Sequence, residues 1–427
     1  MVIMTKSNMR ILRTDDLKFE KSNRKSSFFY DEKKEHILEK NREKSDVEKF
    51  LDRVIAEGLE RKCSDIHIEP FSRFFRVRYR VDGILLNTEE LGIEYYPPIV
   101  SKIKIMCGLD ITERRLPQDG RFNMKYGERT IDFRVGIIPT YHGEKIVIRV
   151  LDRESVEKSL EELGFDRDYY KKLFEIMKRK NGMILFTGPM GSGKTTSMYA
   201  LLNELNNENV NITTIENPVE YSIDGINQIQ CRDDIGLTFS TVLKGILRQD
   251  VDIIMIGEIR DKETAETALR ASLTGHLVIS TVHTGNSSST IKRLIDLGVE
   301  PYIISAGVKG IQNQRLVRNL CPHCKIIDED FEQKIKIIGL NSEKYKNNKF
   351  YTHFGCEKCS FTGYMGRSMI GEFLHIDEKV MEKIENSCSV REIEKVGIEQ
   401  GMVSLVLNGM EKACAGITSL DEIIREC

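Results

Sequence analysis

The sequence predicts an α/β protein whose main domain is a parallel sheet covered by helices on both faces. Short apolar stretches such as "GMILFTG", "DIIMIG" and "HLVIS" suit buried strands, and segments with helical spacing separate them. Upstream, the run "FFRVRYRV" alternates and ends at Asp82-Gly83, a hairpin signal. A smaller α+β domain is therefore expected before the main one.

Length and charge limit the classes of protein to consider. The chain has 427 residues, enough for two or three domains, and a net charge of -2, which gives no global basic field for nucleic acid or an acidic membrane. No apolar run is long enough to span a bilayer, and the apolar stretch at the N-terminus is too short for a secretory signal. These features predict a cytoplasmic protein, docked to a membrane through a partner.

The first part of the chain divides into a polar tail and a small domain. Residues 1–45 carry charge runs such as "DEKKEH" and predict a disordered or helical tail without a core. The α+β domain is expected over 46–154. It comprises a helix from about residue 46 with apolar residues at helical spacing, the hairpin at Asp82-Gly83, a helix near 97–111, and strands over 129–140 and 144–152.

A linker over 154–166 leads to the core domain, expected over 155–318. Helices and strands alternate in the order helix 168–180, strand 182–188, helix 196–207, strand 210–216, helix 239–250, strand 252–260, helix 262–275 and strand 276–283. The remainder is assigned to a four-cysteine subdomain over 319–370 and a helical region over 371–427.

One motif identifies a phosphate-binding site. The segment "GPMGSGKTT" fits G-x-x-x-x-G-K-[ST] and lies between a predicted strand and a predicted helix, which makes a chance glycine-rich turn a poor explanation. Backbone N–H groups and Lys194 would bind the phosphates of ATP, and Thr195 would bind Mg²⁺. The expected nucleotide-binding residues are Gly188, Pro189, Met190, Gly191, Ser192, Gly193, Lys194, Thr195 and Thr196.

Two segments supply candidate acids. Glu216 and Glu220 flank an Asn217-Pro218 turn, and residue types alone do not distinguish a bend from the acid that activates water. Glu258 follows the buried strand "DIIMI", and an acid at that end of a parallel strand lies beside the P-loop, where it can hold Mg²⁺ or orient water. A solvent-facing glutamate is the alternative.

Other polar residues allow two interpretations. His276 and His283 stand at the two ends of one predicted strand, on opposite faces. Their spacing alone favours neither a functional nor a structural role. Arg76, Arg78 and Arg80 share one face of the first hairpin strand, and a solvated face is the favoured interpretation.

Two cysteine pairs predict a structural metal site. Cys321-x-x-Cys324 and Cys356-x-x-Cys359 are separated by 31 residues, and four thiolates can close a tetrahedral Zn²⁺ site. Four independent buried cysteines are the alternative. A long chain of this composition gives no reason to expect a disulfide framework.

Five blocks together resemble the ATPases of type II secretion and type IV pilus assembly. They are "GLDITERRLPQDGRF", "TGPMGSGKTTSMYALL", "TIENPVEY", "ILRQDVDIIMIGEIRDKETAETALRASLTGHLVISTVHTG" and "CPHC…CEKCSFTGYMGR", so the resemblance extends from about residue 46 to the end. It implies a RecA-like ATPase core after a sensor-like α+β domain, and a cytosolic hexamer. That hexamer would dock to an inner-membrane platform protein and drive assembly of pilin or pseudopilin.

The resemblance also implies roles for individual residues. Glu220 matches the catalytic acid of the family's acidic box, and Glu258 the Walker B acid, while Glu216 is left as support. The cysteine pairs match the zinc insert of the assembly branch, which retraction ATPases lack. The remaining matches are to a histidine box (His276 and His283) and to arginines near the nucleotide (Arg134, Arg149 and Arg367).

The chain departs from the family's usual pattern in places. Asn217 stands where an Asp is usual, Val251 where a Pro is common and Lys244 where an Arg is common. Asn217 lacks a charge, which puts a Mg²⁺ role at this position in doubt. Only about 45 residues precede the matching region, whereas many members carry a large docking domain there, so docking is expected through another surface.

Two other classes of function are weighed against the motor. A DNA-translocating or DNA-uptake ring ATPase is one, and the near-neutral charge argues against direct nucleic-acid binding. A scaffold that binds ATP without hydrolysis is the other, and the intact Glu220 and Glu258 argue against it. The sequence does not distinguish pilus assembly from secretion or DNA uptake.

Overall fold

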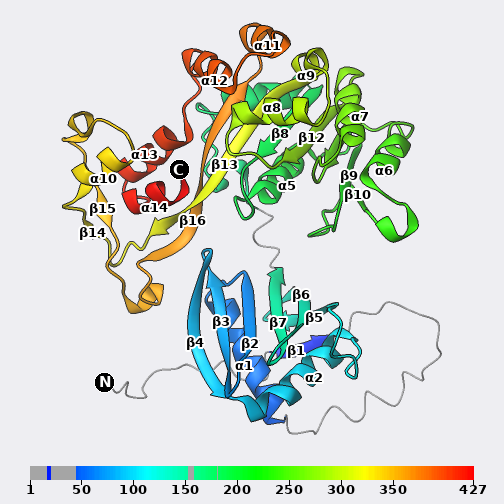
Figure 1. The fold of residues 1–427 in the computed structure, drawn as a ribbon, viewed down its shortest axis with the longest axis vertical. Helices are drawn as coiled ribbons and strands as arrows, with labels where there is room; N and C mark the ends of the chain where they lie inside the picture. The colour runs from blue at the N-terminus through cyan, green and yellow to red at the C-terminus, as the bar shows by residue number, and fades with distance from the viewer. Residues whose placement is uncertain (1–16, 21–44, 152–157, 180) are drawn as a thin grey trace. The chain divides into compact units, whose positions relative to one another are not determined.

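The computed structural model describes residues 17–20, 45–151, 158–179 and 181–427 (Figure 1). It divides into two compact units, Met1–Arg153 and Glu154–Cys427. The expected α/β class, with a small α+β domain ahead of the main one, is confirmed. No helix in the described ranges combines the length and the apolarity needed to cross a membrane.

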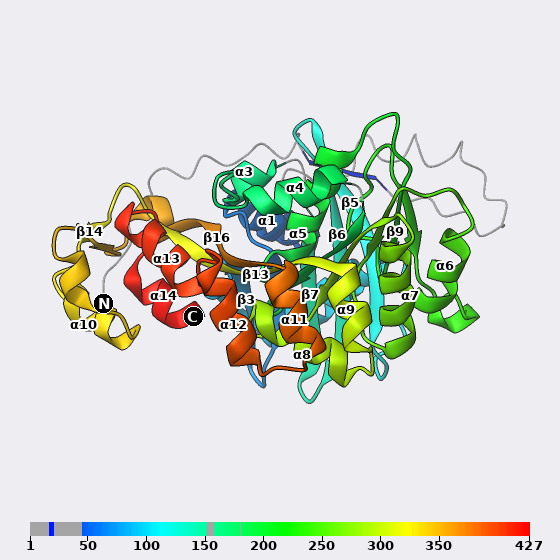
Figure 2. The same cartoon turned by 90° about the horizontal axis from the view of Figure 1, so that it is seen from above.

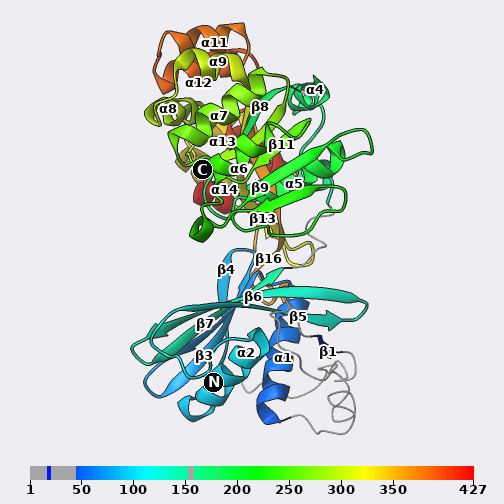
Figure 3. The ribbon, with the colours of Figure 1, turned by 90° about the vertical axis from the view of Figure 1, so that its right-hand side faces the viewer.

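The N-terminal unit is an antiparallel sheet with two helices, seen edge-on in Figure 3. The strand order is β1-β5-β6-β7-β2-β3-β4. Residues from α1, α2 and the strands form one apolar core. The elements are β1 (Leu17–Glu20), α1 (Asp46–Glu60), β2 (Asp65–Pro70), β3 (Phe74–Val81), β4 (Ile84–Gly92), α2 (Tyr96–Cys107), β5 (Gln118–Tyr126), β6 (Arg129–Thr140) and β7 (Gly143–Leu151).

Local sequence explains the ends of these elements. Ser45 accepts a hydrogen bond from the Glu48 N–H and begins α1 with a capping box. Asp82 and Gly83 have positive φ values of 48° and 85° at the predicted β3–β4 turn. The prediction for the tail needs one correction, because Leu17–Glu20 pairs with β5 as a strand. The rest of the predicted tail, up to residue 44, lies outside the described residues.

The arginine stripe on β3 is not a solvated face, so that interpretation is wrong. The Nε atoms of Arg76 and Arg78 donate to Glu69 Oε2 at 2.9 and 2.8 Å, and the Glu69 side chain is only 8% exposed. Burial alone would raise the pKa of Glu69, but Arg78, Arg76 and Lys145 outweigh it and lower that pKa to about 2. Arg80 Nε lies 3.8 Å from Asp65 Oδ2, so the stripe pairs with two acids of the neighbouring strand β2.

The C-terminal unit is built on a seven-stranded sheet in the order β10-β9-β11-β12-β8-β13-β16. All neighbouring pairs are parallel except β13 and β16, which are antiparallel. The strands are β8 (Gly182–Thr187), β9 (Ile212–Glu216), β10 (Asn227–Gln230), β11 (Ile253–Ile256), β12 (Leu277–Val282), β13 (Val308–Leu320) and β16 (Tyr364–His375).

Helices cover both faces of this sheet, as predicted (Figure 2). Alternate strand residues separate the two cores: Ile184 and Phe186 face one, and Met183 and Leu185 face the other. The helices are α3 (Leu160–Leu163), α4 (Lys171–Arg179), α5 (Lys194–Leu205), α6 (Phe239–Ile246), α7 (Lys262–Leu273), α8 (Ser287–Asp296), α9 (Pro301–Gly307), α11 (Glu378–Glu385) and α12 (Val390–Glu399).

A smaller cluster of elements lies where β13 and β16 extend beyond the other strands (Figure 1). The boundaries expected after residues 318 and 370 fall inside these two strands, so the four-cysteine segment begins and ends within the main sheet. The cluster comprises β14 (Ile326–Ile327), α10 (Phe331–Ile337), β15 (Tyr351–Thr352), α13 (Leu405–Cys414) and α14 (Leu420–Glu426). Short 3₁₀ turns lie at Ile93–Tyr95, Asp233–Ile235, Ser342–Tyr345 and Glu357–Cys359.

Candidate functional site

The phosphate-binding loop connects the buried strand β8 to helix α5. Gly188, Gly191 and Gly193 have φ values of 138°, 75° and 87°, a region that L side chains rarely adopt. A Cβ at Gly188 would lie 2.5 Å from the Gln314 carbonyl oxygen, so this glycine is also required by a close approach. Glycines with such φ values are the residues that a loop needs if its N–H groups are to converge on an anion.

The remaining loop residues differ in burial and in their hydrogen bonds. Met190 is 90% exposed at the tip of the loop, and Ser192 is buried at its base. Lys194 begins α5, and its Nζ donates to the carbonyl oxygens of Gly188 and Pro189, both at 2.8 Å. Thr195, in the first turn of α5, is exposed and therefore accessible to a ligand.

Lys194 has a strongly perturbed environment. Burial lowers its pKa to about 8, and the nearby Arg315 acts in the same direction, while Glu258 opposes them. A buried ammonium beside a second cation favours a counter-anion. The environment of Lys194 therefore favours an anion beside its ammonium group.

Glu258 follows strand β11 and lies close to His283, which follows strand β12. The Glu258 side chain is 17% exposed; its Oε1 is 2.5 Å from Arg260 Nη2 and its Oε2 is 3.7 Å from His283 Nε2. β11 and β12 are parallel neighbours, so both residues lie at the carboxyl edge of the sheet, as does the P-loop after β8.

The two glutamates of the "TIENPVEY" stretch differ in environment. Glu216, the last residue of β9, is 3% exposed and accepts hydrogen bonds from Tyr199, Thr214 and Gln228. Burial raises the pKa of Glu216, and these hydrogen bonds act in the opposite direction. Glu220 lies beyond the turn, and its N–H donates to the Tyr199 hydroxyl at 3.4 Å. Glu216 is therefore a buried anchor, whereas Glu220 is half-buried.

His276 is not brought together with this edge. It precedes β12, at the opposite end of the strand from His283, and its Nδ1 lies 3.0 Å from the Ala271 carbonyl oxygen at the end of α7. Within one chain, His276 thus contacts the end of a helix, and only His283 joins Glu258.

The expected arginines occupy two places. Arg134 and Arg149 are direct neighbours on β6 and β7 of the N-terminal unit. Arg121 on β5, which follows the "QDG" of a quoted block, lies opposite Arg134. Because opposed residues share one face of a sheet, the three arginines form a row.

Arg367 lies on β16 opposite Arg318 of β13. The P-loop begins at the level of Asn313, which is paired with Thr187. Five strand residues therefore separate the two levels, a distance of about 16 Å. Arg367 is thus displaced along the strand from the P-loop of its own chain.

Two further residues beside the P-loop were not predicted, Gln314 and Arg315 on β13. Gln314 is fully buried, and its Nε2 donates to the Ser192 carbonyl oxygen at 2.8 Å. Arg315 Nη2 donates to the Gly285 carbonyl oxygen at 2.8 Å. The polar segment "QNQR" is a sequence signal, because such residues are unusual in the interior of a sheet.

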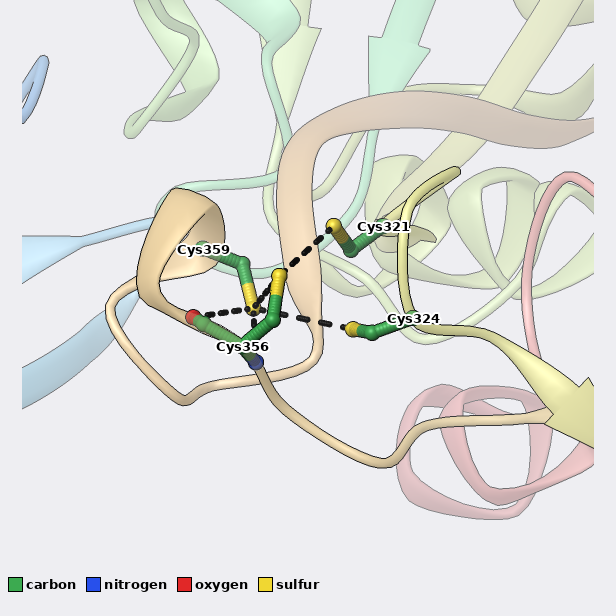
Figure 4. Close-up of side chains that lie close together, drawn as sticks. All are labelled: Cys321, Cys324, Cys356 and Cys359. Atoms are coloured by element: carbon green, nitrogen blue, oxygen red, sulfur yellow. Dashed lines mark hydrogen bonds between the residues drawn. The ribbon is translucent and has the colours of Figure 1, made fainter.

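The four predicted cysteines meet in one cluster (Figure 4). Their Sγ atoms lie within 4.8 Å of one another. Cys321–Cys356, Cys324–Cys359 and Cys356–Cys359 are 3.9, 3.8 and 3.8 Å apart. Four thiolates about 2.3 Å from a tetrahedral Zn²⁺ would be about 3.8 Å apart, so the cluster fits such an ion.

Backbone amides support the thiolate form of one ligand. Burial would raise the pKa of Cys359, but hydrogen bonds from the Cys356 and Gly363 N–H groups, both at 3.2 Å, help to lower it to about 7. Metal ligands need such second contacts to hold their orientation. Burial instead raises the pKa of Cys324 to about 12.

The three departures from the family pattern have different surroundings. Asn217 is exposed at the turn after β9. Lys244 pairs with Glu263 on the neighbouring helix α7, and Val251 is 7% exposed in the core. Lys244 and Val251 are thus accommodated by local contacts, and nothing in the structure explains the Asn at position 217.

The P-loop, the acids at the carboxyl edge of a parallel sheet and the four-cysteine cluster define a P-loop α/β protein with a candidate metal centre. Residues 40–425 match the family described as type II/IV secretion system protein. The chain belongs to this family, which confirms the resemblance found in the motifs.

Relatives of known function are similar over most of the chain. It is 43% identical over 380 residues to the type IV pilus assembly ATPase PilB of Myxococcus xanthus, covering 88% of this chain and 67% of that protein. It is 41% identical over 391 residues to the type II secretion system ATPase E of Vibrio cholerae, covering 92% and 77%. PilB of Thermus thermophilus is 42% identical, and the chain spans 43% of its length.

Solved structures agree on the fold. The ATPase DotB of Legionella pneumophila has a TM-score of 0.66 at 19% identity, covering 90% of this chain and 96% of that one. The pilus retraction motor PilT with bound ADP has a TM-score of 0.61 at 24% identity, covering 90% and 97%. The chain is thus a homologue of pilus assembly and type II secretion ATPases, with a fold shared more widely.

Proposed function

We propose that this chain is a Mg²⁺-dependent ATPase motor that powers assembly of a type IV pilus or a type II secretion pseudopilus. The observation that carries the proposal is the P-loop with Lys194 at the same sheet edge as Glu258 and His283. The names of the curated relatives, which are ATPases of these two systems, support the same function.

Each polar group has a distinct task in this proposal. Lys194 and the loop N–H groups bind the phosphates, and Thr195 and Glu258 hold Mg²⁺, which neutralises charge on the phosphate oxygens. Glu220 takes the proton from the attacking water. Glu216 holds the Glu220 segment through Tyr199, to which both residues are hydrogen-bonded.

The motor acts as a homohexamer on the cytoplasmic face of the inner membrane. Arg367 and His276 are displaced from the P-loop of their own chain, which favours contact with a neighbouring subunit. Arg134 and Arg149 contribute to nucleotide binding in the assembled ring. The ring docks to a platform protein in the membrane and acts indirectly on pilin or pseudopilin. The four cysteines hold a structural Zn²⁺.

Phosphate release from ATP by the purified full-length chain tests the proposal. Lys194→Ala should abolish release, and Glu220→Gln should bind ATP normally while turnover falls about 10²–10⁴-fold, the usual contribution of a general base. Glu208→Gln, an exposed glutamate after α5, is the matched control and should leave turnover unchanged. Normal turnover in Glu220→Gln would refute its role. Stimulation of release by DNA would point to a translocase instead.

A further inference from the structure

Strand β13 runs beside the phosphate-binding loop. Asn313 is paired with Thr187, the last residue of β8, so Gln314 and Arg315 continue alongside the start of the loop. Successive side chains of a strand point to opposite faces. One short segment can therefore contact the loop on one face of the sheet and the connection after β12 on the other.

Gln314 holds the loop itself. Its side-chain Nε2 donates to the Ser192 carbonyl oxygen at 2.8 Å. Its backbone carbonyl oxygen would lie 2.5 Å from a Cβ added at Gly188. The loop is thus packed directly against the β13 backbone. A shift of β13 would therefore move the loop, because close-packed protein interiors are nearly incompressible and transmit strain.

Arg315 ties the connection after β12 to the same strand. Its Nη1 donates to Asn313 Oδ1 at 2.8 Å and to the Gln314 carbonyl oxygen at 3.0 Å. Its Nη2 donates to the Gly285 carbonyl oxygen at 2.8 Å. Gly285 comes two residues after His283, whose Nε2 lies 3.7 Å from Glu258. One guanidinium therefore bridges the strand that supports the P-loop and the segment that carries His283.

A buried carboxylate completes this network. Glu372 on β16 lies opposite Asn313 and is 5% exposed. Its Oε1 accepts from the Ser287 N–H at 2.8 Å and from Asn313 Nδ2 at 3.2 Å. Its Oε2 accepts from the Leu405 N–H at 3.4 Å. Ser287 and Leu405 are the first residues of α8 and α13, where a carboxylate is stabilised by the helix termini.

We propose that Arg315 is a positioning residue for ATP hydrolysis, oriented by Asn313 and Glu372, and that it keeps the His283 segment in register with the P-loop. The inference rests on the proposed ATPase function. Gln314 and Lys194 hold the phosphate-binding loop independently of Arg315. Loss of Arg315 therefore leaves ATP binding largely intact, but it misplaces His283 and Glu258 relative to the phosphates of the bound ATP.

Arg315→Met and Arg315→Lys in the full-length chain provide the test. Because misplacement of about 1 Å can reduce a rate about 10²-fold, Arg315→Met should lower kcat about 10–100-fold with KM for ATP within about threefold. Arg315→Lys keeps the charge and should recover part of kcat. Arg318→Met, which removes a half-buried arginine from the same strand away from the loop, is the matched control and should keep kcat.

Hydrogen exchange gives a readout independent of turnover. In Arg315→Met, the backbone amides of Thr284 and Ser287 should exchange faster than in the wild-type chain, while amides of α5 stay protected. If Arg315→Met keeps the wild-type kcat, or raises KM without lowering kcat, the positioning role is wrong although the ATPase function stands. If the wild-type chain releases no phosphate from ATP, the proposed function itself fails.

Discussion

The Tyr199 hydroxyl donates a hydrogen bond to the Glu216 carboxylate, and both side chains are buried. Tyr199 lies on α5, the helix that begins at Lys194, and Glu216 ends β9. The same hydroxyl accepts the N–H of Glu220 at 3.4 Å. One phenol therefore connects the helix that follows the P-loop to both glutamates of the acidic turn.

Tyr199→Phe should weaken the fold and the reaction together. The variant removes a donor from a buried carboxylate and leaves the Glu220 amide without this acceptor, a change that costs about 1–3 kcal/mol. Turnover should fall several-fold, because the segment that carries Glu220 loses its contact with α5. Scanning calorimetry and steady-state phosphate release measure the two effects.

A buried tyrosine in the other unit provides the control for Tyr199→Phe. Tyr79 also donates from its hydroxyl to a glutamate, Glu57, at 3.3 Å and to the Val54 carbonyl oxygen at 3.0 Å. Tyr79→Phe should reduce stability by a similar amount and leave turnover per folded chain unchanged. Equal losses of turnover in both variants would contradict a specific link between Tyr199 and the acidic turn.

The sequence predicts the elements whose signals are local. The P-loop between β8 and α5 follows from glycines at fixed spacing, and the β3–β4 hairpin follows from Asp82-Gly83. The cysteine cluster follows from paired spacing, because each pair needs only a tight turn. In the loop, in the hairpin and within each cysteine pair, the residues that decide the local structure are close in the chain, whereas the meeting of the two cysteine pairs depends on the fold.

Features that depend on distant pairing could not be predicted in this way. Strand β16 joins the main sheet beside β13, although the whole four-cysteine segment separates them in the chain. Arg76 was assigned to solvent because its partner Glu69 lies on another strand. His276 and His283 are correctly predicted at the two ends of one strand, but only the pairing of β12 with β11 brings Glu258 beside His283. Gln314 and Arg315 gain their significance only from the register of β13 with β8.

ATP affinity should depend on pH through Lys194. Burial lowers the pKa of Lys194 to about 8, so the ammonium of the nucleotide-free chain is charged below this pH and loses its proton above it. Phosphates favour the charged form, and the free chain therefore takes up a proton when it binds ATP above pH 8. The dissociation constant should rise by up to about tenfold for each pH unit above 8.

Equilibrium titration with a fluorescent ATP analogue between pH 7 and 9.5 measures this dependence. Lys194→Arg is the control, because a guanidinium keeps its charge over the whole range. Its affinity should be lower than that of the wild-type chain at pH 7 and nearly constant up to pH 9.5. A flat wild-type profile, or the same slope in Lys194→Arg, would show that another group titrates.

Removal of the metal should unfold the four-cysteine segment and spare the P-loop. Purified chain should contain about one Zn²⁺, and Cys324→Ser should lose it, because three thiolates no longer close the tetrahedral site. Cys231→Ser, at a single buried cysteine in the core, should keep the ion. Elemental analysis measures the metal, and limited proteolysis between residues 322 and 362 reports the loss of local structure.

The free energy of metal binding explains why loss of Zn²⁺ should unfold the four-cysteine segment alone. Structural Zn²⁺ sites have apparent binding free energies of about 10–16 kcal/mol. Burial of the small apolar cluster around Ile335 and Phe350 cannot supply a stabilisation of this size once the ion is removed. A strong chelator with reductant should therefore expose this segment to protease, while binding of a fluorescent ATP analogue persists at the P-loop. Metal-free chain that resists proteolysis as well as the zinc-loaded chain would mean that packing alone holds the four cysteines together.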